Sequence, residues 1–355
     1  MAETKTEIED DFAEYMPIMR SKSSISFQIT QKDVCPLPLM KDMPESIYGA
    51  AMMAVIRSSQ TFHNKSVHGI SFCVFVGLAL NVITQFYVLY CTKLYICVPA
   101  VSKVRRLYEA FHWDTFVDGQ FSEEAWEHFS QAGELCQLPL SQPMFFFSIL
   151  VVWTGTCWVD LVESFRYVRL WCNLKTAVSN KSVEIEKSED AMLTTAAALR
   201  TKVAVVWFIF APKIAIAVYL WWLGARWLTS TTNFQDLLLN AVALAFITEL
   251  DELMYKVIVP EDIQALVGMY KIARSGYGCK PDIVAEHFHE TCSTMLEESD
   301  RAARRRIARI LVTMAVVTAL PILYMRYLQN VLPGYRWDVH APCESRVAEF
   351  LDLEA

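Results

Sequence analysis

Apolar residues of this chain gather in long blocks separated by polar and charged stretches, and five blocks predict membrane-spanning helices. A helix needs about 20 predominantly apolar residues to cross the hydrocarbon core of a bilayer. The blocks cover residues 68–91, 143–162, 203–225, 235–258 and 310–325. The pattern predicts an all-α fold, a polytopic transmembrane helix bundle of about five spans with helical loops outside the membrane. The lipid bilayer is therefore the first partner that we expect.

The same blocks set the predicted domain organisation. Residues 1–66 form an N-terminal region with one short apolar stretch, ESIYGAAMMAVI. This stretch is too short to span a bilayer, and it predicts a helix that lies at the interface or packs on the bundle. Residues 67–329 hold the bundle, and residues 330–355 form a C-terminal tail.

Two polar connections between the blocks are expected to be helical. The stretch EIEKSEDAMLTTAAALRTK, within residues 163–202, predicts a helix that continues into the third span. Residues 259–309 predict two amphipathic helices that break at SGYGCKP, because glycine and proline interrupt helices. His287 and His289 in this connection would point about 200° apart on a helix, so they predict no shared metal ion.

The functional prediction depends on the hairpin of the third and fourth spans, which are joined by the polar turn RWLTSTTNF. Lys213 lies 17 residues before Ser230 in this turn, and Glu249 lies 19 residues after it. At about 1.5 Å per helical residue, the two charges differ in depth by about 3 Å. A lone Lys in lipid costs at least about 2.5 kcal/mol, so we expect Lys213 to pair with Glu249 or Asp251.

The acidic end of the fourth span has two interpretations. On one continuous helix, Glu249 and Glu252 share a face with Lys256, whereas Asn240 and Asp251 lie on a nearly opposite face. In the first interpretation, the membrane helix ends before these acids, which lie among the lipid headgroups. In the second, they stay inside the membrane with the lysine of the third span, as a charge lock or as a proton or cation site. The predicted ion or proton site comprises Lys213, Asn240, Glu249, Asp251 and Glu252.

Polar residues also occur in the first two spans. Asn81, Thr84 and Gln85 share one face of the first span, which predicts hydrogen bonds to a neighbouring helix or the lining of a pathway. Asp160 and Glu163 close the second apolar block. We expect these two acids to be solvated at the level of the headgroups.

The connection between the first two spans, residues 92–142, contains a stretch that resembles an EF-hand calcium loop. Asp114 and Asp118 match the first and fifth loop positions, and Glu124 stands one residue before the position of the bidentate glutamate. Ala125 occupies that twelfth position, and an aromatic residue replaces the third oxygen ligand. The pattern therefore favours a turn followed by a helix that is capped by Ser122. Apart from this incomplete calcium pattern, we predict no metal site.

Composition and charge narrow the classes of function. Hydrophobic residues make up 54% of the chain, and the formal net charge of −7 gives no electrostatic case for nucleic-acid binding. The N-terminus is acidic and lacks the basic and apolar regions of a signal peptide. No G-x-S-x-G, HExxH, P-loop or Rossmann string occurs. We therefore predict no catalytic residue and no cofactor, and an enzyme is the least favoured class.

Lys and Arg counts near the span ends predict the orientation of the chain. Only Lys and Arg residues within about 20 residues of a span end are counted. On one side, the N-terminus, residues 163–202 and residues 259–309 contribute 16 of these basic residues. On the other side, residues 92–142, the hairpin turn and the C-terminal tail contribute 7. The N-terminus should therefore be cytosolic and the C-terminus lumenal or extracellular. This orientation places three cysteines in a compartment where a disulfide can form: Cys97, Cys136 and Cys343.

One segment shows a family resemblance. The strings WWLGARWLTST and LNAVALAFITELDELMYKVIVPE, around residues 219–260, resemble a recurrent segment of multi-pass membrane proteins of dinoflagellate algae. The resemblance implies that the hairpin is a structural unit, and it implies no particular activity.

Two functional hypotheses follow from these patterns. The first is a channel or transporter component with an intramembrane charged site. Because five spans in one chain are few for a pore, this hypothesis implies a homo-oligomer. The second is a non-catalytic membrane scaffold or receptor-like protein whose cytosolic loops bind protein partners, with the charges only locking helices together. Ion flux that depends on the charged site would favour the first hypothesis.

Overall fold

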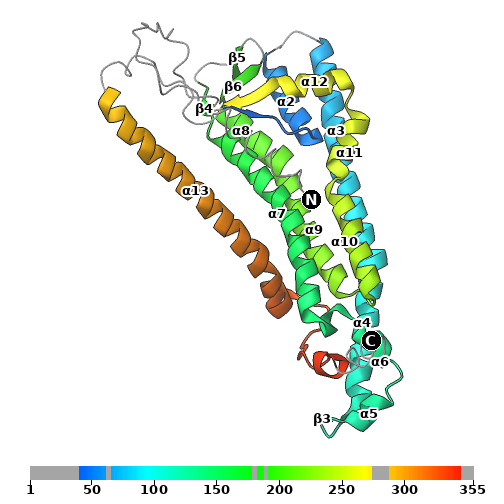
Figure 1. Ribbon diagram of the computed structural model, residues 1–355. Helices are drawn as coiled ribbons and strands as arrows, with labels where there is room; N and C mark the ends of the chain where they lie inside the picture. Colours follow the sequence, from blue (N-terminus) through cyan, green and yellow to red (C-terminus); the bar gives the residue numbers. More distant parts are fainter. Residues whose placement is uncertain (1–39, 61–64, 178–181, 188–190, 274–287, 345–355) are drawn as a thin grey trace, which may run out of the picture. The chain divides into compact units, whose positions relative to one another are not determined.

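The computed structural model describes residues 40–60, 65–177, 182–187, 191–273 and 288–344 of the chain (Figure 1). Four helical segments among them are long and apolar enough to cross a bilayer: Val67–Thr115, Pro143–Cys172, Leu199–Thr229 and Ala303–Leu328. Each of these segments contains one of the predicted apolar blocks. The all-α class of the predicted fold is confirmed.

The bundle helices extend beyond the apolar blocks that predicted them. The first span, α3 (Lys65–Cys91), continues through a π-helical turn, η1 (Thr92–Cys97), into α4 (Val98–Thr115). One continuous helix therefore runs from α3 through η1 to the end of α4, well beyond the predicted apolar block. The other elements that contain apolar blocks are α7 (Pro143–Cys172), α8 (Leu199–Val205), η3 (Val206–Phe210), α9 (Ala211–Thr229), α13 (Phe288–Leu323) and η5 (Tyr324–Leu328).

The fourth predicted span, residues 235–258, is not one helix, which corrects the prediction. α10 (Phe234–Thr248) has 15 residues, and α11 (Leu250–Ile258) begins after a break at Glu249. At the end of α10 a threonine hydroxyl donates a hydrogen bond to the carbonyl oxygen of Ala245 (2.6 Å), a contact that bends helices. Positions counted on one continuous helix therefore do not give the faces on which the acidic residues lie.

The predicted hairpin is formed by α9 and α10, which pack against each other (Figure 1). The side-chain amide of Asn240 donates to the Thr231 hydroxyl (3.0 Å) and so closes the turn. α7 packs on α9 at Gly224, where an added Cβ would lie 2.5 Å from the indole ring of Trp153. The Trp153 indole N–H in turn donates to the Trp221 carbonyl oxygen (3.1 Å). A glycine is needed here because it lets the two helices approach closely.

A small mixed sheet lies at one end of the bundle, and the sequence pattern did not predict it. The stretch expected to be helical before the third span instead forms two strands, and the helix begins only at Leu199. The alternation of apolar and acidic residues in VEIEK has the period of a strand. The strands are β1 (Met40–Asp42), β4 (Lys175–Thr176), β5 (Val183–Lys187), β6 (Met192–Ala197) and β7 (Tyr270–Ala273), in the order β1-β7-β6-β4 with β5 paired to β6.

The short apolar stretch near the N-terminus forms α2 (Ile47–Gln60), which packs on α3. Ten of its 14 residues are buried, so it belongs to the core and does not lie free at an interface. α12 (Glu261–Met269) also packs on α2 and leads into β7. The predicted break at SGYGCKP lies outside the described residues.

At the other end of the bundle, residues 98–142 and 329–344 form a unit that we call the disulfide module. A disulfide joins Cys136 to Cys343, whereas Cys97 is a free, buried cysteine. Besides α4, the module contains β2 (Phe116–Val117), β3 (Gln120–Phe121), α5 (Glu123–Glu127), α6 (Ala132–Cys136) and η2 (Pro139–Ser141).

The stretch that resembles a calcium loop is a tight β-hairpin in this module. β2 and β3 pair through a two-residue turn in which Asp118 and Gly119 have φ of 53° and 79°. Asp-Gly at such a turn is typical of a hairpin because both positions require positive φ. The Ser122 side chain accepts a hydrogen bond from the Ala125 backbone N–H, so the predicted turn and helix cap are confirmed.

Candidate intramembrane charged site

Lys213 on α9 forms an ion pair with Asp251 on α11, one of the two partners predicted for it. The Lys213 Nζ lies 3.1 Å from Asp251 Oδ2, and the two side chains are 20% and 8% exposed. Lys213 stands 16 residues before Thr229, which corresponds to about 24 Å along the helix. Since the hydrocarbon core is about 30 Å thick, the pair lies nearer to the sheet end of the bundle than to the disulfide module.

An aromatic ring from α2 covers the lysine. The Nζ of Lys213 lies 5.0 Å from the centroid of the Tyr48 ring, within the range of a cation–π interaction. The Tyr48 hydroxyl donates to Gln85 Oε1 and accepts from Asn81 Nδ2, both at 3.4 Å. Burial, and then the Asp251 carboxylate, raise the pKa of this hydroxyl, so it stays neutral. The predicted hydrogen bonds from the polar face of the first span to a neighbouring helix are thus present.

A second carboxylate reaches the same place from α7. Asp160 and Cys157 line a cavity of about 30 Å³ together with Lys213 and Asp251. A cavity of this size holds about one water molecule. The site therefore combines one ammonium group with two carboxylates, and it carries an excess negative charge when both carboxylates are ionised.

Three of the predicted site residues do not reach Lys213. Glu249 and Glu252 are exposed, and Asn240 is bound in the hairpin turn. The break at Glu249 is the physical reason, because it starts a new helix that turns Asp251 inward and leaves its acidic neighbours outside. Of the two acids predicted to pair with Lys213, the structure therefore brings Asp251 to the lysine, and not Glu249.

The sequence prediction missed Asp160 and Tyr48 as members of the site. Asp160 was expected among the headgroups because the apolar block ends there, yet α7 continues for another 12 residues to Cys172. The amphipathic continuation SFRYVRLW is the signal that could have shown this. Tyr48 lies in a stretch too short to span, so only tertiary packing brings it to the lysine.

The calcium-like residues do not converge. Asp114, Asp118 and Glu124 are each exposed, at the end of α4, in the hairpin turn and in α5. Among the described residues, no group of three or more His, Cys, Asp or Glu side chains could hold a metal ion. His287 lies outside the described residues.

The outer surfaces of the long helices are apolar and fit an integral membrane protein. Phe72 on α3, Phe208 on η3 and Ile310 on α13 are 69%, 76% and 62% exposed. Lipid tails, and not water, are the medium that such surfaces suit. Comparisons of the chain with protein-family models, with curated proteins and with solved structures give no match. The geometry of the charged site is therefore the basis for inferring a function.

Proposed function

We propose that the protein is a channel or transporter component in which Lys213, Asp251 and Asp160 form a protonatable site inside the membrane. The observation that carries this proposal is the presence of two carboxylates and one ammonium group around a single small cavity. Ionisable groups at membrane depth are costly, and they commonly serve in ion and proton pathways.

The size of the cavity limits what the site handles. A volume of about 30 Å³ excludes a large solute and admits about one water molecule. The transported species is therefore a proton or a small cation. Because Lys213 neutralises Asp251 directly, Asp160 is the carboxylate that exchanges its proton.

The proposal is tested by ion flux in liposomes that contain the purified protein. Wild-type protein should carry protons or a small cation faster than protein-free liposomes, and Asp251→Asn should reduce the flux at least tenfold. Glu249→Gln is the matched control, because that carboxylate is exposed and lacks the lysine partner. Wild-type flux equal to that of empty liposomes would overturn the proposal, and so would full flux in Asp251→Asn.

A second function, a non-catalytic membrane scaffold with charges that only lock helices, is favoured by one observation. Lys213 already has an ion-pair partner and an aromatic ring within the same chain. In that case the exchange Lys213→Asp with Asp251→Lys should preserve the fold, and neither the exchanged nor the wild-type protein should carry ions. Partners would then bind the cytosolic loops.

We propose further that the disulfide module faces the lumen or the outside and that the sheet end faces the cytosol. Two observations support this orientation: the Cys136–Cys343 disulfide, which requires an oxidising compartment, and the excess of Lys and Arg at the sheet end. After mild reduction, a membrane-impermeant thiol reagent should label Cys343 either in sealed cells or only after internal membranes are dissolved. Labelling that appears when the plasma membrane alone is permeabilised would contradict this orientation.

A further inference from the structure

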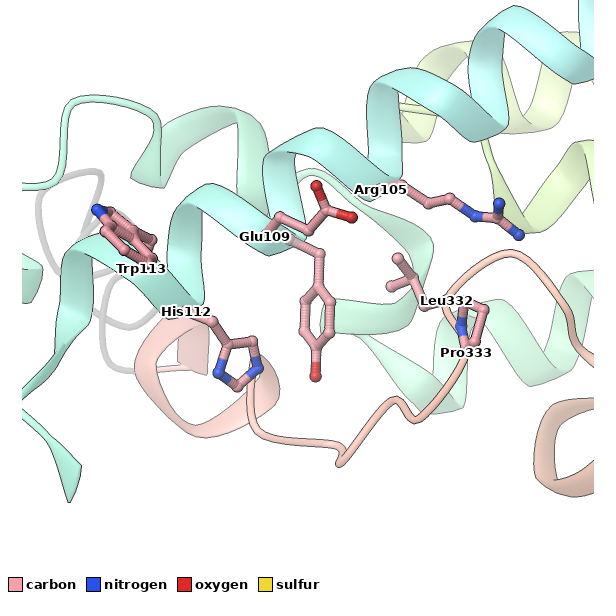
Figure 2. Close-up of a pocket in the computed structure, with 7 residues that line it drawn as sticks. Arg105, Glu109, His112, Trp113, Leu332 and Pro333 are labelled. Atoms are coloured by element: carbon pink, nitrogen blue, oxygen red, sulfur yellow. The ribbon is translucent and has the colours of Figure 1, made fainter. Parts of the chain in front are cut away.

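The disulfide module contains a cleft that the charged site does not use. It has a volume of about 600 Å³, within the range of about 300–1,000 Å³ of small-molecule sites. One wall is α4 and the other is the chain that follows η5 (Figure 2). The lining residues are Arg105, Tyr108, Glu109, His112, Trp113, Leu332 and Pro333.

The two walls of the cleft are fixed to each other. The guanidinium of Arg105 donates to the carbonyl oxygens of Val331 (2.8 Å) and Asn330 (2.6 Å). The Tyr108 hydroxyl donates to Asp338 Oδ1 (3.0 Å), and the disulfide closes the module. A cleft with such walls exists before a ligand arrives, so binding has little ordering cost.

Two side chains on the α4 wall have no partner among the residues that the structure describes. Glu109 is exposed and forms no hydrogen bond or ion pair with any residue that the structure describes. Trp113 is 87% exposed, although indole rings are usually well buried. The two residues are four apart on a helix and so lie on the same face. Figure 2 shows them following each other along α4.

This pair of side chains has the chemistry of an ammonium site. A cation is attracted to the face of an indole ring, and more strongly when a carboxylate lies near it. The Arg105 guanidinium donates to two carbonyl oxygens of the opposite wall, which leaves it fewer N–H groups for an anion. The His112 ring faces Asp338 (Nε2 to Oδ2, 3.0 Å), so it too is already engaged.

The net negative charge of the whole module also favours a cationic ligand. Residues 98–142 and 329–344 contain nine Asp and Glu residues against four Lys and Arg residues. The resulting negative potential concentrates cations near the module. A metal ion is a poor match, because Glu109 is a single carboxylate and the walls otherwise present aromatic rings, Leu332 and Pro333.

We propose that this cleft binds a small organic ammonium ion, held by the Glu109 carboxylate and the Trp113 indole. This site is independent of the charged site in the membrane. A quaternary ammonium group fits the arrangement best, because it needs no hydrogen-bond acceptors and it packs on aromatic and apolar walls.

The test is a binding titration of the purified full chain with choline, in a maltoside detergent that carries no ammonium group. Saturation-transfer difference NMR should show saturable binding. 3,3-Dimethyl-1-butanol, the uncharged isostere of choline, should bind at least tenfold more weakly. Trp113→Ala and Glu109→Gln should each weaken choline binding about tenfold, and Glu123→Gln, an exposed acid outside the cleft, should not.

Three results would overturn the proposal. They are the absence of saturable choline binding to the wild-type protein, equal affinity for the uncharged isostere, and unchanged affinity in the variant that carries both cleft substitutions. The three single variants and the double variant change only exposed side chains outside the hydrophobic core, so we expect them to fold. Size-exclusion elution identical to that of the wild type verifies this for each variant.

Discussion

The charged site around Lys213 and the cleft of the disulfide module both contain charged residues, but they satisfy these charges in opposite ways. Within the helix bundle, Lys213 is paired with Asp251 beside a cavity of about 30 Å³. In the module, Glu109 is unpaired among the described residues, at a cleft of about 600 Å³. The difference follows from solvation: a charge away from water must find its partner within the protein, whereas an exposed charge stays hydrated until a ligand comes.

Removal of one partner of the buried pair should destabilise the protein most. Asp251→Asn leaves the Lys213 ammonium without its counter-charge, and we expect a loss of about 3–5 kcal/mol in the free energy of unfolding. Thermal unfolding in detergent, followed by near-ultraviolet circular dichroism, measures the loss. Glu249→Gln should stay within about 0.5 kcal/mol of the wild type. Equal losses in both variants would show that the Lys213–Asp251 pair stabilises the fold no more than an exposed carboxylate does.

The next largest effect concerns the open cleft. Cys343→Ser removes the disulfide that ties the C-terminal segment to α6, and we expect a loss of about 2–4 kcal/mol. The same substitution should weaken choline binding, because the two walls lose a fixed distance. Unfolding curves with and without reductant measure the first effect, and Cys73→Ser, a free and exposed cysteine, is the control. A wild-type curve that does not respond to reductant would contradict the role of the disulfide.

A smaller effect is expected at the contact between α7 and α9, which brings Asp160 and Lys213 to one cavity. Gly224→Ala places a Cβ 2.5 Å from the Trp153 ring, so the helices must separate or the ring must move. Overpacking of this kind costs about 1–3 kcal/mol. Gly133→Ala is the matched control, since its Cβ would meet nothing within 4 Å. A Gly224→Ala variant with wild-type stability would show that this contact is adaptable.

The smallest effect should come from the ring above the lysine. Tyr48→Phe keeps the cation–π contact and removes only the hydroxyl that joins Asn81 to Gln85. The expected loss is about 0.5–1.5 kcal/mol. Tyr48→Leu also removes the ring, so it should lose more. If the two variants unfold at the same temperature, the ring does not stabilise the ammonium group.

Local patterns predicted much of the fold, because each long apolar block must form a helix in lipid. The turn between α9 and α10 and the Ser122 helix cap were likewise predicted from a few neighbouring residues. The sheet was missed because β6 acquires its partners from β1, β4, β5 and β7, which are far apart in the sequence. Its one local sign, the alternation in VEIEK, is short.

The charged site was predictable only in part. Counting residues along the hairpin predicts that Lys213 has an acidic partner at a similar depth on the next helix. Which acid faces the lysine does not follow from counting, because the break at Glu249 resets the helical phase. Tyr48 and Asp160 come from helices whose packing the sequence pattern does not specify.

Asp160→Asn tests the proposed ion site most sharply, because it removes the surplus carboxylate and leaves the Lys213–Asp251 pair intact. Proton and cation flux into liposomes should be measured beside thermal unfolding of the same preparation. We expect this variant to be at least as stable as the wild type and its flux to fall at least tenfold. A stable variant with wild-type flux would contradict the claim that these groups form an ion site and would leave a charge lock.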